Sequence, residues 1–214
     1  MRLINADCLE VMRTMENDSV DLTLTDIPYA EVSRAGGGLR NLDKGKADIL
    51  TFDLDSFLTE VYRVTKGTCI IFCGMEQFSR IFKFFACKKG TVRQIVWCKS
   101  NPSPMNGQLV YLSGTENAVW FKKKGAAFNA RCKPNWFTFP CGRHGLHPTQ
   151  KNISLFETLL LDNSAEHQTV FDPCMGSATT GVVALRNRRN FIGVERDKNY
   201  FENCVKRLDE LKRV

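Results

Sequence analysis

Long hydrophobic runs are missing from this 214-residue chain. Because no stretch of about 18 apolar residues occurs, no transmembrane helix is expected. The start, Met1-Arg2-Leu3-Ile4-Asn5, lacks the basic and then apolar layout of a signal peptide. No internal repeat or low-complexity segment stands out either. These absences argue against a membrane protein, an exported protein and a repeat array, and we expect a cytoplasmic protein.

A disulfide framework is not indicated, although the chain has nine cysteines. The count is odd, no export signal accompanies it, and several thiols lie in apolar runs such as Cys69 to Cys73. We therefore expect free, buried thiols. Cys132, Cys141, His144 and His147 offer two thiols and two imidazoles, but their spacing matches no common zinc finger, so we expect no metal.

The charge balance is basic, with 30 Lys and Arg against 23 Asp and Glu and a net charge of +7. Such an excess suits a phosphate-bearing partner such as DNA, although many basic proteins bind no nucleic acid. The basic residues gather around two glycine-containing segments that read as loops. The candidate nucleic-acid contacts are Arg34, Arg40, Lys44 and Lys46 in one loop and Lys122, Lys123, Lys124, Arg131 and Lys133 in the other.

Strand and helix patterns alternate along most of the chain, which predicts one α/β domain over residues 1–214. Predicted strands cover Leu3-Ile4, Val20 to Asp26, Thr68 to Cys73, Val92 to Trp97, Asn117 to Phe121, Gln168 to Asp172 and Phe191 to Glu195. Predicted helices begin near Leu9, Leu54, Phe78, Ser154, Thr179 and Asp197. Gly67 is expected to end the second helix, Ser154 and Glu157 to form a capping box, and Arg188 to end the fifth. The periodicity lapses from Lys122 to Leu146, which we interpret as an elaborated loop.

A turn rich in small residues joins the strand ending at Asp172 to the helix beginning at Thr179. In doubly wound sheets, ligands bind just beyond the carboxyl ends of strands. Glu195 ends the next strand, 23 positions after Asp172 and near the spacing at which an acid meets a ribose diol. A dinucleotide site would need more glycine than Ser177 and Ala178 leave, so S-adenosylmethionine is favoured over NAD. The alternative is a turn whose glycines serve only packing.

Asp7 follows the first predicted strand. If the last helix leads spatially into that strand, Asp7 lies at the same edge as Asp172 and Glu195 and can accept a hydrogen bond from the adenine of the cofactor. An ordinary helix cap is the equal alternative.

Asp26-Ile27-Pro28-Tyr29 ends another strand and carries the candidate chemistry. An exocyclic base amine is a poor nucleophile because its lone pair is delocalised into the ring. The Asp26 carboxylate and the Ile27 carbonyl, accepting its two N–H bonds, would stabilise the positive charge that develops on methylation. Pro28 keeps Ile27 extended, and Tyr29 is placed to stack on the base. The alternative is a simple strand end.

Together these motifs resemble the DNA amino-methyltransferases, which modify adenine N6 or cytosine N4. Asp26 to Tyr29 is similar to the catalytic Asp-Pro-Pro-Tyr of that family, and 171–180 to its cofactor loop Phe-Asp-Pro-Phe-x-Gly-Ser-Gly-Thr-Thr. The segment 147–151 resembles the one that lines the methionine end of the cofactor. The catalytic motif comes first, as in the beta subgroup. The resemblance covers Leu3 to about Arg207.

This resemblance implies a class I methyltransferase fold, with a mostly parallel, doubly wound sheet that is circularly permuted so that the catalytic half comes first. It implies cofactor contacts from Asp7, Cys8, His147, Thr149, Lys151, Phe171, Asp172, Pro173, Gly176, Ser177, Thr179, Thr180 and Glu195. Cys174 and Ala178 replace Phe and Gly of the loop, and Asn152 stands where the family often has Pro. The short segment 122–146 occupies the place of the target-recognition region, where Trp136, Phe137 and Phe139 either contact bases or pack on the sheet.

The sequence thus predicts an adenine-N6 DNA methyltransferase that uses S-adenosylmethionine, since the first motif residue is Asp and cytosine-N4 enzymes often have Ser. Cytosine N4, an RNA base or a glutamine amide as the methyl acceptor, and a catalytically silent nucleic-acid-binding partner, are the alternatives. The sequence does not decide whether the protein forms a homodimer or whether a restriction endonuclease accompanies it.

Overall fold

The computed structural model describes residues 1–29, 52–104, 107–142 and 151–211. These residues form one eight-stranded sheet with a layer of helices on each face, six helices in all. The strands are β1 Arg2–Asn5, β2 Val20–Asp26, β3 Thr65–Cys73, β4 Thr91–Lys99, β5 Thr115–Lys122, β6 Trp136–Phe139, β7 Thr169–Asp172 and β8 Asn190–Glu195. The helices are α1 Cys8–Thr14, α2 Leu54–Val64, α3 Met75–Ala86, α4 Ile153–Asn163, α5 Thr179–Arg186 and α6 Lys198–Leu211.

The sheet has the strand order β1-β8-β7-β2-β3-β5-β4-β6. Among the strands of the described segments, five pairs are parallel and only the two that involve β5 are antiparallel, so β5 runs against the other seven. The chain winds outward in opposite directions from β2 and from β7, which lie side by side. This is the predicted doubly wound, mostly parallel sheet.

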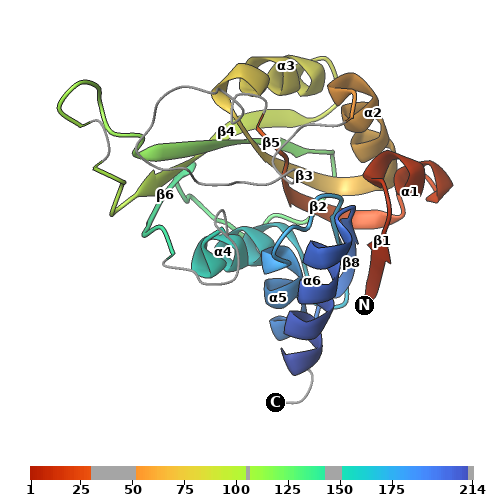
Figure 1. Cartoon of the computed structure of the whole chain (residues 1–214). Coiled ribbons are helices and arrows are strands. Elements are labelled where there is room, and N and C mark those ends of the chain that lie inside the picture. Colours follow the sequence, from red (N-terminus) through yellow and green to blue (C-terminus); the bar gives the residue numbers. More distant parts are fainter. Residues whose placement is uncertain (30–51, 105–106, 143–150, 212–214) are drawn as a thin grey trace.

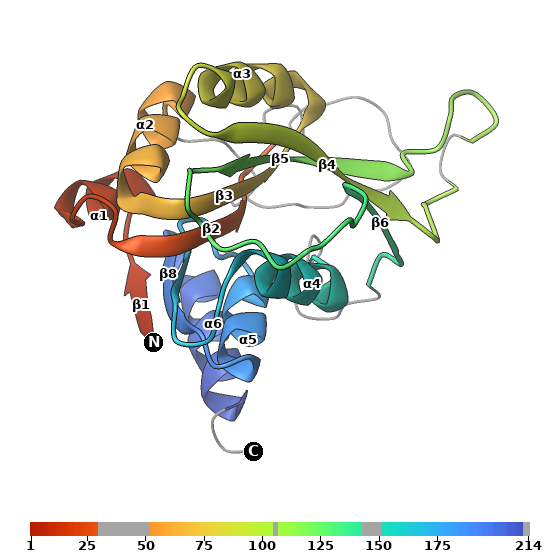
Figure 2. The ribbon, with the colours of Figure 1, turned by 180° about the vertical axis from the view of Figure 1, so that it is seen from behind.

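Each face of the sheet is covered by three helices (Figures 1 and 2). Helices α1, α2 and α3 lie on one face, and α4, α5 and α6 lie on the other. Strand β3 supplies both cores by alternation, since Ile70 and Phe72 join the cluster under α4 while Cys69 and Ile71 join the cluster under α2 and α3. Within the described segments, no helix is long and apolar enough to cross a membrane.

The two ends of the described chain meet at one side of the sheet, as the predicted permutation requires. Strand β1 pairs in parallel with β8, with Asn5 opposite Glu195, and α6 packs against β1. The Asn5 amide also donates to the carbonyls of Glu195 and Arg196 at 2.8 and 3.0 Å. The carboxyl ends of β1 and β8 therefore lie at the same edge.

Three local expectations were wrong. Gly67 does not end α2; the helix stops at Val64 and Gly67 lies inside β3. The segment 122–146 is not loop throughout, because β6 joins the sheet beside β4. The N-cap of α4 is Asn152, which accepts from the amide of Leu155 at 2.9 Å, while Ser154 lies inside the helix.

The cysteine prediction was correct for disulfides but not for burial. All nine thiols are free. Cys8, Cys69, Cys73 and Cys204 are buried, whereas Cys87 and Cys132 are exposed. Cys87 is exposed because it caps the C-terminus of α3, and Cys132 is exposed in the segment between β5 and β6.

Gly67 provides a test of the β2–β3 pairing. A Cβ there would lie 2.1 Å from the carbonyl oxygen of Asp21, so the two strands would have to separate. We expect Gly67→Ala to lower the free energy of unfolding by roughly 1–3 kcal/mol. At Gly114 the nearest atom to an added Cβ is 3.8 Å away, so Gly114→Ala should be nearly neutral. Urea denaturation of both variants is the measurement, and equal effects would contradict the close approach.

Candidate active site

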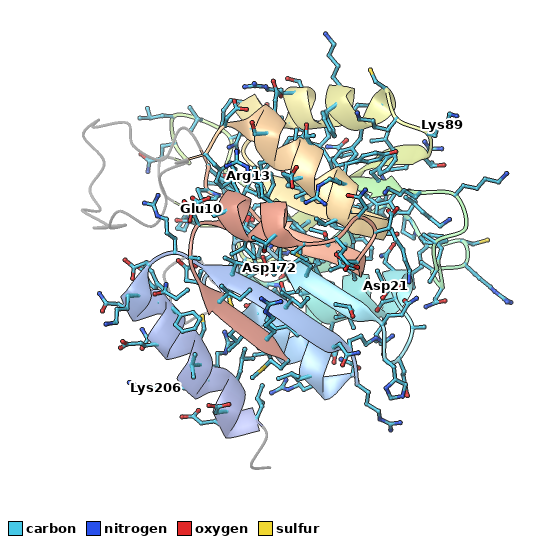
Figure 3. All side chains as sticks on the ribbon, turned by 90° about the vertical axis from the view of Figure 1, so that its right-hand side faces the viewer. Glu10, Arg13, Asp21, Lys89, Asp172 and Lys206 are labelled. Atoms are coloured by element: carbon cyan, nitrogen blue, oxygen red, sulfur yellow. The ribbon has the colours of Figure 1, made fainter. Side chains whose placement is uncertain are left out.

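The carboxyl ends of adjacent strands bring the predicted acids to one edge of the sheet. Asp26 ends β2, Asp172 ends β7 and Glu195 ends β8, and these strands are parallel neighbours. Asp7 follows β1 at the same edge. Figure 3 shows Asp172 in the interior of the molecule, whereas Lys206 points outward from α6. The four acids that the sequence singles out separately thus lie at one edge of the sheet.

Asp172 fastens the two halves of the sheet together. Its Oδ1 accepts from the Thr25 hydroxyl at 2.7 Å and from the Cys174 amide at 3.1 Å. Burial raises the pKa of this carboxyl to about 7, despite the hydrogen bonds from Thr180 and Thr25 that favour the ionised form. The structure therefore gives Asp172 a structural task in addition to its predicted place beside the cofactor.

The turn after Asp172 is shaped for close approach to its neighbours. Gly176 has φ of +48° and Ala178, the N-cap of α5, has φ of +59°. This left-handed conformation explains why glycine suits the position of Ala178 in the resembled loop. The Cys204 thiol donates to the Gly176 carbonyl at 2.7 Å, and the Arg207 guanidinium donates to the Ser177 carbonyl. Helix α6 thus holds the turn from behind.

Glu195 has capacity left for a diol. Its Oε2 accepts from the Gly176 amide at 3.1 Å and its Oε1 from the Asp197 amide at 2.8 Å. The Arg196 amide is a third backbone donor to this carboxylate. A carboxylate can accept about four hydrogen bonds, so at least one acceptor site remains for a ribose hydroxyl. Burial raises the pKa of Glu195, opposed by these backbone donors.

Asp7 caps helix α1, accepting from the amides of Leu9 and Glu10 at 2.9 and 3.3 Å. The cap alternative is therefore correct, and Asp7 nevertheless lies at the shared edge. Other predicted cofactor residues are placed more deeply. Phe171 has no exposed surface, and Cys8, Thr179 and Thr180 are buried. Any contact of these four with a cofactor stays a prediction.

Asp26 has one oxygen engaged and one free. Oδ2 lies 3.0 Å from the Lys151 amine. Oδ1 is buried and has no hydrogen-bond partner among the described residues. Burial raises the pKa of Asp26 to about 6, against the opposing charge of Lys151. A buried carboxylate oxygen without a donor is costly, so this atom is suited to receive an N–H group from outside.

The rest of the predicted motif supports this arrangement. The Ile27 amide donates to the Phe72 carbonyl at 3.1 Å, which extends the β2–β3 pairing beyond Asp26. The Pro28 carbonyl accepts from the Gln77 amide group at 2.9 Å. The Tyr29 hydroxyl accepts from Lys151 at 3.0 Å and donates to Glu116 at 3.3 Å. Hydrogen bonds therefore hold the backbone of Ile27 and Pro28 and the side chain of Tyr29 next to Asp26.

Glu116 and Lys99 are the residues that the sequence reading missed. Glu116 on β5 lies 2.5 Å from Lys151 and 2.9 Å from Lys99 on β4. Their positions show only ordinary strand alternation, and no motif marks them. Only the strand order, which inserts β5 next to β3, reveals that they face Asp26.

The candidate nucleic-acid contacts fall into two groups. Arg34, Arg40, Lys44 and Lys46 lie outside the described residues, as do His147 and Thr149. Lys122 ends the antiparallel strand β5 opposite Thr68 near the start of β3, so Lys122, Lys123 and Lys124 lie at the edge away from Asp26. Lys123 pairs with Asp18 at 2.9 Å and Lys133 with Asp162 at 2.5 Å. This position does not favour contact with a base held at Asp26.

The aromatic residues of the segment 122–146 divide between the two expected roles. Phe137 and Phe139 pack against the core cluster on the α4 face. Trp136 is 55% exposed and is the one of these three that remains available to a partner. Cys132 and Cys141 precede and follow β6, and the described residues include no group of three or more metal-ligating side chains.

Residues 129–206 match a family model described as DNA methylase. The resemblance to the DNA amino-methyltransferases is confirmed. The chain is 27% identical to the type II methyltransferase M.HinfI of Haemophilus influenzae, over 98% of this chain and 68% of that protein. It is also 27% identical to the type II methyltransferase M2.DpnII of Streptococcus pneumoniae, over 98% and 90%.

Solved amino-methyltransferase structures have the same fold. The M1.HpyAVI–SAM complex is 29% identical and superposes with a TM-score of 0.74, covering 97% of this chain and 99% of that one. The cytosine-N4-specific PvuII DNA methyltransferase gives a TM-score of 0.75 at 19% identity, over 96% and 85%. The predicted class I methyltransferase fold is thereby confirmed.

The raised pKa of Asp172 gives a pH-dependent test. From about pH 4 to pH 7 the folded protein retains a proton that the unfolded chain has released, so this group's contribution to stability falls as the pH rises. Asp172→Asn has no proton to lose. Its free energy of unfolding, measured by urea denaturation, should rise relative to the parent between pH 5 and pH 8, by at least about 1 kcal/mol, the equivalent of one pKa unit. The control is Asp55→Asn, which changes an exposed acid. If the free energies of unfolding of the two variants depended on pH in the same way, the raised pKa of buried Asp172 would be contradicted.

Proposed function

We propose that this protein is a DNA methyltransferase that transfers a methyl group from S-adenosylmethionine to the exocyclic N6 amine of adenine. The observation that carries the proposal is the buried Oδ1 of Asp26, which has no partner within the described part of the chain and lies two strands away from Glu195 at the same edge of the sheet. The similarity to type II methyltransferases and to a structure solved with SAM supports it.

The residues at the edge fit this cofactor. Glu195 keeps acceptor capacity for a ribose hydroxyl. The turn at Gly176 leaves open space, since the nearest atom to an added Cβ is 4.0 Å away. Asp7 lies across the β1–β8 pair from Glu195, where the adenine of the cofactor would reach. S-adenosylmethionine, when bound, supplies an electrophilic methyl group and leaves as a neutral thioether.

Asp26 would activate the acceptor amine. One N–H of the amine would donate to Asp26 Oδ1, and the other to the Ile27 carbonyl, which localises the lone pair toward the methyl carbon. The nitrogen forms the new N–CH₃ bond and becomes cationic, then releases one proton to restore a neutral amine. Asp26, ionised above about pH 6, stabilises the cation and can receive that proton.

A base inside a duplex cannot reach Asp26, so the target must be flipped out of the helix. Tyr29 is held by its hydroxyl, which leaves the ring face as a candidate stacking surface for the flipped base. Arg34, Arg40, Lys44 and Lys46 stay as predicted phosphate contacts. A restriction endonuclease of the same specificity would be the natural partner of such an enzyme, since the relatives are type II methyltransferases.

Cytosine N4 is the second candidate acceptor, because the PvuII cytosine-N4 enzyme shares the fold. Digestion of methylated DNA to nucleosides separates the two products. N6-methyladenine supports the proposal, and N4-methylcytosine alone would overturn the choice of base.

Asp26→Ala separates chemistry from cofactor binding. The variant loses the acceptor of the amine proton, so single-turnover methylation with saturating DNA should slow by roughly 10²–10³-fold, as when one preorganised electrostatic partner is lost. Cofactor affinity, measured by calorimetry, should stay within a few-fold. Tyr29→Phe should retain more activity than Tyr29→Ala because it keeps the stacking face. Near-parental methylation by Asp26→Ala would remove the role proposed for this residue.

Glu195→Ala tests the ribose contact. Loss of a charged acceptor should weaken S-adenosylmethionine binding by about 1.5–3 kcal/mol. The affinity of Glu195→Gln should lie between those of Glu195→Ala and the parent protein. Glu166→Ala, an exposed acid paired with Arg188 at 3.3 Å, is the matched control and should bind normally. Unchanged binding by Glu195→Ala in calorimetry would contradict the cofactor assignment at this strand end.

A further inference from the structure

Four charged side chains form a continuous chain that leads from β4 to the candidate catalytic acid. Lys99 Nζ lies 2.9 Å from Glu116 Oε1. Lys151 Nζ lies 2.5 Å from Glu116 Oε2 and 3.0 Å from Asp26 Oδ2. The side chains of Lys99 and Glu116 are 14% and 19% exposed, and Lys151 is buried. Two cations and two anions alternate, so the chain is neutral as a whole.

Lys151 has no donor left for a ligand. An ammonium group has three N–H donors. Asp26 Oδ2, Glu116 Oε2 and the Tyr29 hydroxyl lie 3.0, 2.5 and 3.0 Å from Nζ, which accounts for all three. The resemblance implies a cofactor contact for the segment that contains Lys151, but in this structure its amine is committed to the acceptor side of the site.

We infer that Lys151 and Glu116 are positioning residues for Asp26: Lys151 holds Asp26 ionised, with Oδ2 locked and Oδ1 turned toward the methyl acceptor, and Glu116 holds Lys151 in place. This inference rests on the proposed methylation of a base amine. Lys151 supplies the counter-charge and fixes Oδ2. Glu116 orients Lys151 from the opposite side and also accepts from Tyr29, so both residues of the catalytic motif that face the base are tied to one ammonium group.

The two partners act on the Asp26 carboxyl in opposite senses. Burial raises the pKa of Asp26, the Lys151 charge lowers it and the Glu116 charge raises it. Burial acts to lower the pKa of Lys151, but Asp26, Tyr29 and Glu116 outweigh it, so Lys151 stays protonated.

Other groups also face this site. Asp172 on β7 and Cys73 on β3 are close enough for the Asp26 charge to raise their pKa values. The Tyr29 hydroxyl also lies close enough to Asp26 to lower its pKa. None of these three groups is altered in the variants below, so their influence is common to all of them.

The test compares Lys151→Met with Glu116→Gln. Asp26 must be ionised to accept the amine proton, so methylation should fall below the Asp26 pKa. Without the Lys151 charge that pKa rises and the acid limb of the rate profile moves to higher pH. Without the Glu116 charge it falls and the limb moves to lower pH. At a fixed pH near 7, the Lys151→Met rate should fall about tenfold for each unit by which the Asp26 pKa exceeds the assay pH.

Several controls isolate the positioning role. Lys66→Met removes a lysine that pairs with Asp21 at 2.8 Å near the amino ends of the strands, and its profile should match the parent. S-adenosylmethionine binding by Lys151→Met should stay within a few-fold, whereas a cofactor ligand would show a large loss. If Lys151→Met does not fold, as judged by circular dichroism, Glu116→Gln alone still tests the direction of the shift.

A direct titration makes the result independent of turnover. The carboxyl ¹³C resonance of Asp26, assigned by its loss in Asp26→Asn, should titrate near pH 6 in the parent and shift in opposite directions in the two variants. Shifts in the same direction, or none, would overturn the inference. A parent that titrates as expected but methylates no DNA would instead contradict the proposed function, so the two failures are distinguishable.

Discussion

The junction between β2 and β7 is the contact on which the site depends. These strands belong to the two halves of the doubly wound sheet, and their ladder is short, with Leu22 opposite Val170 and Thr23 opposite Phe171. Beyond it, the Thr25 hydroxyl donates to Asp172 and the Thr180 hydroxyl donates to the Leu24 carbonyl at 3.3 Å. These bonds fix how far Asp26 stands from the turn after Asp172. A ligand that spans the junction therefore contacts residues of both halves of the sheet at fixed relative positions.

Asp172 and Asp26 both lie at this junction, and burial is the largest cause of the raised pKa of each. The two carboxyl groups nevertheless have different roles. Asp172 is buried with donors on Oδ1 from both halves, so it works as a connector in either protonation state. Asp26 is half-buried beside a protonated lysine, which opposes the cost of ionisation, and its Oδ1 has no partner among the residues that the structure describes. Different neighbours thus give one carboxyl a structural role and the other a chemical one.

Much of this arrangement could be predicted from the sequence because its main determinants are local. Strand ends at Asp26, Asp172 and Glu195 follow from short apolar-rich segments and from the proline or turn residues that come next. Parallel strands then place these ends at one edge. The meeting of β1 with β8 was predicted only on the condition that the last helix leads into the first strand, and the packing of α6 against β1 meets that condition. Local capping was less predictable: Ser154 and Asn152 both suit an N-cap, and only the observed φ and hydrogen bond at Asn152 decide between them.

The polarity of β5 explains why sequence reasoning did not find the electrostatic partners of Asp26 and could not say at which edge of the sheet Lys122 lies. Residues 115–122 read as a strand, but a strand pattern has no direction. Because β5 is antiparallel between β3 and β4, its first residues, including Glu116, lie at the edge of Asp26, and its last residue, Lys122, lies at the opposite edge. A parallel strand would have exchanged them, bringing the lysines to the site and removing the acid that orients Lys151. One strand direction, set by tertiary pairing, therefore determines both the charge chain behind Asp26 and the remoteness of the lysine cluster.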